Sequence, residues 1–178
     1  MTTELSLYFD TDCLSAFLWV KDESLLPQLY PGRVVIPKQV YDELGRVPHL
    51  QARIDKLLKR GDVSVMEIQA GTDGHQLYAE FTRRPRPGHM IIGRGEAASL
   101  ALAKSNNGIV ASNNLKDISQ YLEEYQLAHK TTGDILIEAL DNGLITESDG
   151  NTLWANMLSK KRQLGASSFT AYLKSKGR

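Results

Sequence analysis

The stretch Leu5-Ser6-Leu7-Tyr8-Phe9-Asp10 decides the fold of this chain. A short apolar run that ends in an acid is typical of a buried strand. A helical pattern follows at once, with Leu14, Phe17 and Leu18 spaced along one face. Asp12 is placed to cap that helix. A strand that leads directly into a helix predicts the first half of a strand–helix–strand crossover unit.

The same alternation continues along the chain. The further strands that we predict cover residues 33–36, 62–68 and 109–112. The further helices that we predict cover residues 37–45 and 49–60, an alanine-rich stretch opened by Glu96, and everything from Leu115 onward. In that last part, Thr131 with Asp134 and Thr146 with Asp149 match the capping-box signature. Strands that alternate with helices indicate an α/β protein with a mostly parallel sheet covered on both faces.

Composition narrows the class of protein. With 178 residues the chain is expected to form one compact core. Lysine plus arginine equal aspartate plus glutamate, at 21 each, so any nucleic-acid binding must come from local patches. The single cysteine, Cys13, excludes an internal disulfide and a cysteine-based zinc cluster. We find neither a signal peptide nor an apolar stretch that could span a membrane, and we expect a cytoplasmic protein without a membrane partner.

Polar side chains stand at or just beyond the predicted strand ends: Asp10, Glu43, Glu96, Asn114 and Asp117. Ligands of open α/β sheets bind beyond the carboxyl ends of the strands, so we expect these side chains to converge. Oxygen ligands suit Mg²⁺ or Mn²⁺, and a cation offsets the repulsion between carboxylates. Such a site would activate water to attack a phosphodiester. Each acid alone also suits a helix cap or a solvated helix end, so the prediction depends on the whole set.

At this point the chain resembles the PIN-domain nucleases over residues 5–145. The motifs that carry the resemblance are Tyr8-Phe9-Asp10-Thr11-Asp12-Cys13-Leu14, Ile36-Pro37-Lys38-Gln39-Val40-Tyr41-Asp42-Glu43-Leu44, residues 95–103, residues 109–114, and the segment from Gly133 to Ile145. The order and spacing of these motifs are more specific than any one of them.

This resemblance implies a three-layer α/β/α, Rossmann-like fold and a cofactor that is Mg²⁺ or Mn²⁺. It also implies cleavage of single-stranded RNA. Many bacterial members are VapC-like toxins of toxin–antitoxin pairs, which would make RNA the substrate and a cognate antitoxin a partner, with the chain as a homodimer. We place the PIN-like domain at residues 1–145 and a helical C-terminal extension, docked on the same core, at residues 146–178.

Carried over to this chain, the family's first three acids match Asp10, Glu43 and Glu96. The fourth acid, usually an aspartate after a Ser-Asn or Thr-Asn pair, falls on Asn114. The resemblance thus implies a metal held by Asp10, Glu96, Asn114 and Asp117, where Asp117 supplies the charge that Asn114 lacks. The alternative is a catalytically impaired PIN-like module that binds RNA or a partner protein.

Basic residues are concentrated in a predicted exposed loop, residues 82–95, and comprise Arg83, Arg84, Arg86 and Arg94. These arginines precede Glu96, so they could hold RNA phosphates at the mouth of the acidic site, although a flexible solvated loop has the same composition. The run Lys160-Lys161-Arg162 is predicted to be a solvated helix end.

The segment Gly93-Arg94-Gly95-Glu96-Ala97-Ala98 also fits a dinucleotide-binding fingerprint. We favour this alternative less, because Glu96 would put a carboxylate where a pyrophosphate must bind.

Overall fold

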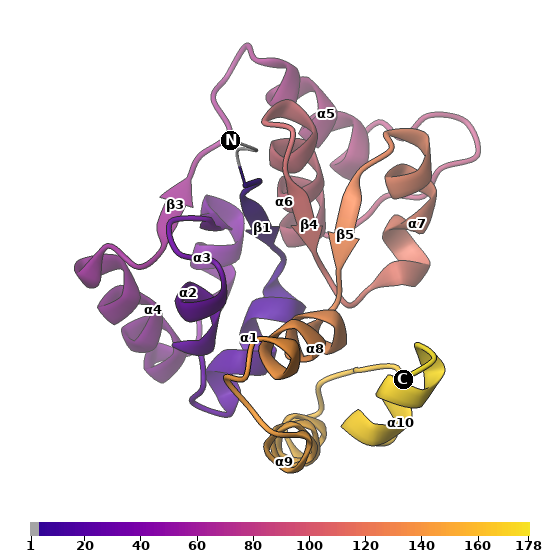
Figure 1. Ribbon diagram of the computed structural model, residues 1–178. Coiled ribbons are helices and arrows are strands. Elements are labelled where there is room, and N and C mark those ends of the chain that lie inside the picture. The colour runs from indigo at the N-terminus through magenta and orange to yellow at the C-terminus, as the bar shows by residue number, and fades with distance from the viewer. Residues whose placement is uncertain (1–3) are drawn as a thin grey trace.

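A computed structural model describes residues 4–178. Its centre is one parallel sheet with the strand order β3-β2-β1-β4-β5 (Figure 1). The strands are β1 (Leu7–Phe9), β2 (Val34–Pro37), β3 (Ser64–Met66), β4 (Ile109–Ala111) and β5 (Ala128–Lys130). The chain builds outward from β1 on one side and then returns to place β4 on the other. The switch point of the sheet therefore lies between β1 and β4.

Helices cover both faces of the sheet, which confirms the predicted three-layer α/β/α fold. The helices α1 (Thr11–Trp19), α2 (Leu25–Leu29), α3 (Lys38–Leu44), α4 (Pro48–Arg60), α8 (Thr132–Asp141), α9 (Glu147–Ser159) and α10 (Phe169–Ser175) contribute to the core on one face. On the other face lie α5 (Asp73–Thr82), α6 (Arg94–Ser105) and α7 (Leu115–Glu124). Among residues 4–178, no helix is long and apolar enough to cross a membrane.

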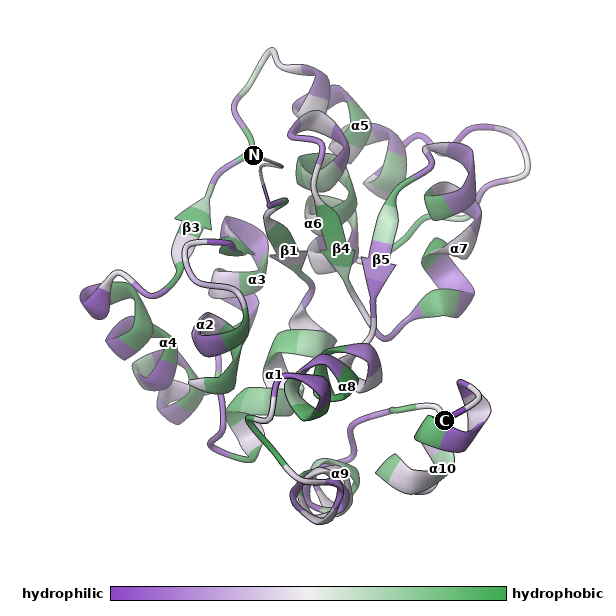
Figure 2. Cartoon of the chain, in the orientation of Figure 1, coloured by the Kyte–Doolittle hydropathy of each residue, from purple (hydrophilic) through white to green (hydrophobic). Residues whose placement is uncertain are grey.

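Side-chain alternation along the central strands supplies the two cores. Leu7 and Phe9 of β1 face the core that contains α1, while Tyr8 between them faces α6. This is the two-residue period of a strand, and it works here because both faces are covered. Figure 2 shows the result: β4 is largely apolar, whereas the outer helices α4 and α7 alternate between apolar and polar surfaces.

Two sequence-based expectations about local structure were wrong. The region after Leu115 is not wholly helical, because Ala128–Lys130 forms the edge strand β5. Its residues show no apolar alternation, and only pairing with β4 makes them a strand. The cap of α1 is Asp10 rather than Asp12: its side chain accepts a hydrogen bond from the Cys13 amide, and Asp12 lies in the first turn.

The C-terminal helices α9 and α10 pack on the same core as β1 and α1. Trp154, Phe169 and Tyr172 are buried there. The approach of α10 to α9 is close, since a Cβ atom at Gly150 would lie 2.2 Å from the Phe169 ring. The predicted boundary between residues 145 and 146 stays a prediction.

Both predicted capping boxes are present, and the first also anchors α10. The Asp134 carboxylate accepts hydrogen bonds from the Thr131 amide (2.9 Å) and from the Tyr172 hydroxyl (2.7 Å). Burial on its own raises the pKa of Asp134, but these hydrogen bonds outweigh it and lower the pKa below the ordinary value of 3.8. The second box, Thr146 with Asp149, has no tyrosine contact.

Asp134→Asn is expected to lower the free energy of unfolding at pH 7 by about 1–2 kcal/mol, because it weakens two hydrogen bonds to a charged group. A carboxylate with a depressed pKa stabilises the fold above its unfolded pKa and loses that effect as the pH falls through the folded pKa. The difference from the wild type should therefore shrink below about pH 4. Urea denaturation at both pH values measures it, with Asp149→Asn as a control of smaller effect. A difference that persists undiminished at acid pH would contradict this account.

Candidate active site

Asp10 lies at the carboxyl end of β1, beside the switch point of the sheet. Its carboxylate is buried and accepts hydrogen bonds from the Cys13 amide (2.8 Å) and the Ser112 hydroxyl. Ser112 directly follows β4, so this contact joins the two central strands at their carboxyl ends. Burial raises the pKa of Asp10 to about 7, although both hydrogen bonds lower it. An acid so deprived of water favours a proton or a cation nearby.

Glu43 reaches the same edge of the sheet from α3. Its Oε2 atom accepts a hydrogen bond from Thr11 Oγ1 (2.8 Å), the first residue of α1. The start of α6 presses against this pair, because a Cβ atom at Gly95 would lie 2.7 Å from Thr11 Oγ1 and 3.4 Å from Glu43 Oε2. Gly95 therefore lets α6 bring its next residue, Glu96, close to the other acids.

Glu96, Asn114 and Asp117 form a second group beside them. The Nδ2 atom of Asn114 donates to Glu96 Oε1 (2.7 Å) and to Asp117 Oδ2 (2.8 Å). One neutral amide thus bridges two carboxylates from its position just before α7, which begins at Leu115 as predicted. The other oxygen of Glu96, Oε2, is buried and has no hydrogen-bond partner in the described part of the chain, residues 4–178. The pKa of Glu96 is raised above its ordinary value, because burial and the nearby carboxylates of Asp117 and Asp12 outweigh the hydrogen bonds from Asn114 and the Gly93 backbone.

Three of the four sequence-predicted acids line one pocket of about 120 Å³. Asp10, Glu43 and Glu96 contribute to it, together with Thr11, Asp12 and the Gly93–Gly95 backbone. Asn114 and Asp117 are linked to this pocket through Glu96. Within residues 4–178, no three His, Cys, Asp or Glu side chains are close enough together to form a ready ligand group.

These residues fit a hard divalent cation by chemistry. The pocket offers oxygen ligands, a buried carboxylate oxygen that no donor among residues 4–178 satisfies, and a buried acid with a strongly raised pKa. Magnesium usually keeps several waters and takes only one or two carboxylates directly. Asp10 and Glu96 would therefore be enough as direct ligands, and the remaining acids, Glu43 and Asp117, need not be within bonding distance of the ion.

The arginines of the predicted loop have different surroundings. Arg94 is exposed and lines the acidic pocket. Arg86 forms an ion pair with Glu124 and donates to the Tyr125 hydroxyl (2.7 Å), so its charge is already partnered. Arg83 and Arg84 are exposed where α5 ends. The prediction of an exposed loop over residues 82–95 was wrong in two respects: α6 already begins at Arg94, and Ile92 is buried against the core.

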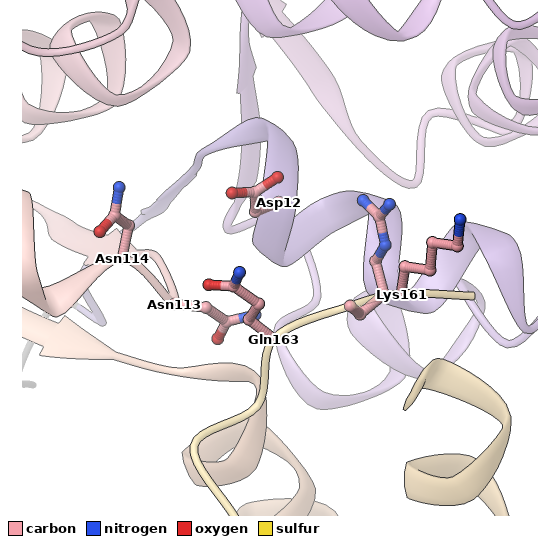
Figure 3. Close-up of a pocket in the computed structure, with 6 residues that line it drawn as sticks. Asp12, Asn113, Asn114, Lys161 and Gln163 are labelled. Carbon is pink, nitrogen blue, oxygen red and sulfur yellow. The ribbon is translucent and has the colours of Figure 1, made fainter. Parts of the chain in front are cut away.

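Sequence reasoning missed a second polar pocket, of about 180 Å³, on the other side of Asp12. Its lining combines Asp12, Asn113 and Asn114 with Lys161, Arg162 and Gln163 (Figure 3). The last three residues come from the connection between α9 and α10, and Arg162 Nη1 donates to Ser15 Oγ of α1 (3.0 Å). The basic run was visible in the sequence, but nothing in its spacing indicated that it returns to the acids.

Asn113 has a structural role at this pocket. Its Oδ1 atom accepts from the Thr132 amide (2.7 Å), and its Nδ2 atom donates to Thr132 Oγ1 (2.8 Å). Both ends of the amide thus tie the loop after β4 to the start of α8. Asn113 therefore fixes the position from which Asn114 projects.

Comparison with known families agrees with this geometry. A family model described as a PIN domain, DUF3368, matches residues 7–178. This chain therefore belongs to the PIN-domain family, whose fold is of the nuclease type. The match includes α9 and α10 as well as the sheet. No curated protein matches the chain significantly.

Asn114→Asp is expected to change how the fold responds to manganese. In EDTA the variant should melt at a lower temperature than the wild type, because a third carboxylate replaces the amide between Glu96 and Asp117. With Mn²⁺ its melting temperature should rise by more than that of the wild type. A ligand at one hundred times its Kd stabilises a fold by about 2.7 kcal/mol.

Differential scanning calorimetry measures both melting temperatures. Asn156→Asp, on the exposed side of α9, adds the same charge away from the pocket and should leave the response to Mn²⁺ unchanged. Equal manganese-induced shifts in the wild type and in Asn114→Asp would show that no cation binds next to Asn114.

Proposed function

We propose that this protein is a metal-dependent endoribonuclease that cleaves single-stranded RNA with Mg²⁺ or Mn²⁺ as cofactor. One observation carries the proposal: carboxylates just after β1, in α3 and in α6 line a single pocket beside the switch point, and one of their oxygens is buried with no hydrogen-bond partner among residues 4–178. Burying acids together costs free energy, and a bound cation offsets that cost. Membership of the PIN-domain family supports the same conclusion.

We assign separate roles in metal binding, proton transfer and phosphate binding to the residues of the pocket. Asp10 and Glu96 would hold the ion, with Asn114 and Asp117 next to Glu96. A bound ion would lower the pKa of a water molecule that it coordinates and would neutralise negative charge on the phosphate. Glu43 is held by Thr11 through one oxygen; its other oxygen, Oε1, has no hydrogen-bond donor within residues 4–178 and is free to accept a proton from the attacking water. Arg94, exposed at the pocket, would hold a phosphate of the substrate.

The biological setting is part of the same proposal. The resemblance to VapC-like toxins supports a role as the toxin of a toxin–antitoxin pair, acting as a homodimer that a cognate antitoxin inhibits. A cytoplasmic location would give such an enzyme access to its RNA.

Asp10→Asn should reduce RNA cleavage in Mn²⁺ at least about 100-fold, because the neutral amide removes charge where the ion is held. The control Asp73→Asn neutralises an exposed acid in the first turn of α5 and should cleave like the wild type. Gel analysis of a labelled single-stranded RNA gives the rates. Cleavage of equal rate in Asp10→Asn would mean that a contaminant is responsible.

A second candidate function is an RNA- or partner-binding module with impaired catalysis. The amide of Asn114 favours it, since a neutral donor occupies the position of an acid in the family pattern. This module would bind RNA in EDTA and would leave the RNA uncut when Mn²⁺ is added.

Replacement of Asn114 by aspartate, the residue of the family pattern, distinguishes the nuclease from the binding module. If the protein is an enzyme handicapped by the amide, Asn114→Asp should cleave RNA several-fold faster in Mn²⁺ than the wild type. Lower activity in Asn114→Asp would show that the site is built around the amide, and absence of cleavage in both proteins would favour the binding module.

A further inference from the structure

We infer that the pocket formed by Asp12, Asn113, Asn114, Lys161, Arg162 and Gln163 is the subsite for the RNA nucleotide next to the scissile phosphodiester. In this inference Arg162 and Lys161 bind its phosphate. The inference rests on the proposed function, because it assigns a substrate contact to the same enzyme. It gives the connection between α9 and α10 a role in binding substrate.

The position of the pocket is the first reason. Asp12 lines both this pocket and the acidic one, and Asn114 lines this pocket while contacting Glu96 of the other. The two pockets therefore adjoin at Asp12. A strand with its scissile phosphodiester at the acids would place a neighbouring nucleotide in the second pocket.

The charge of the pocket is the second reason. Arg162 is half-buried, and hydrogen bonds to Ser15 Oγ (3.0 Å) and to the Lys160 carbonyl (3.0 Å) hold its guanidinium. Within residues 4–178, neither Arg162 nor Lys161 forms a salt bridge with a carboxylate. An arginine that is fixed but not neutralised is suited to bind phosphate, because its planar fork matches the phosphate oxygens.

The arrangement of side chains gives the phosphate and the base separate places. In Figure 3, Lys161 and Asn114 stand on opposite sides of the pocket, and Gln163 lines the pocket together with Asp12 and Asn113. The carboxylate of Asp12 would repel a phosphate, so the phosphate belongs on the side of Arg162 and Lys161. Gln163 is exposed, and its amide has no hydrogen-bond partner within residues 4–178, so it can hydrogen-bond the edge of a base.

The test measures binding without cleavage. Fluorescence anisotropy of a labelled single-stranded RNA in EDTA gives Kd over a range of salt concentrations for the full chain. Lys161→Ala and Arg162→Gln should each raise Kd about tenfold at low salt. The slope of log K against log salt should become shallower by about 0.7 for each phosphate that the variant no longer binds. Arg162→Lys, which keeps the charge, should keep the slope.

Controls separate charge from folding. Lys59→Ala removes an exposed lysine of α4 and should change neither Kd nor slope. Lys161→Ala removes an exposed side chain, so its effect does not depend on the contact between Arg162 and α1. Single-stranded DNA of the same sequence should show the same decrease in slope, because the phosphate is shared.

The subsite and the nuclease can fail separately. Wild-type affinity and slope in both Lys161→Ala and Arg162→Gln would overturn the subsite, even if the protein cleaves RNA. A wild type that does not bind RNA at low salt would overturn it too. Binding that depends on Arg162 and Lys161 in a protein that never cleaves RNA would support the subsite and refute the nuclease.

Discussion

The hydrogen bonds that hold the Asp10 carboxylate are the contacts on which the candidate site depends. They come from Ser112, just beyond β4, and from the Cys13 amide in the first turn of α1. One buried acid therefore joins the two central strands and caps the helix that leaves the switch point. Burial raises the free energy of the charged carboxylate, and the pKa of Asp10 rises to about 7 as a result. A buried carboxylate of this kind supports the proposal that a cation binds beside Asp10.

Close packing and hydrogen bonds position the other parts of the site relative to Asp10. Gly95 allows α6 to approach Thr11 and Glu43, and Asn113 ties the loop after β4 to α8. The C-terminal helices belong to the same system, because the Tyr172 hydroxyl bonds the Asp134 cap of α8. Between those helices the chain returns to α1 and delivers basic residues next to the acids. The candidate site therefore has one pocket lined by acidic side chains and a neighbouring pocket lined in part by the basic side chains of Lys161 and Arg162.

Much of this fold could be predicted from local sequence. Apolar runs marked β1, β2 and β4, and the capping boxes at Thr131 and Thr146 mark the starts of α8 and α9. The sequence also predicted that Asp10, Glu43 and Glu96 lie at one edge of the sheet, since the carboxyl ends of parallel strands share that edge. The three acids line one pocket there, but within residues 4–178 no three such side chains are close enough to form a ligand group. The edge strand β5 could not be predicted, because its pairing with β4 and not its own pattern makes it a strand.

The sequence by itself determined the parallel α/β architecture and the edge of the sheet at which Asp10, Glu43 and Glu96 lie, because strand periodicity and strand-end positions are local properties. Only the tertiary structure decided what surrounds those acids. The bridge from Asn114 to Glu96 and Asp117 depends on the direction of one amide, and the place of Arg162 beside α1 depends on how a distant connection folds back. Neither the Asn114 bridge nor the position of Arg162 can be recognised from a periodic pattern in the sequence, because packing of the whole core sets the contacts between segments far apart in the chain.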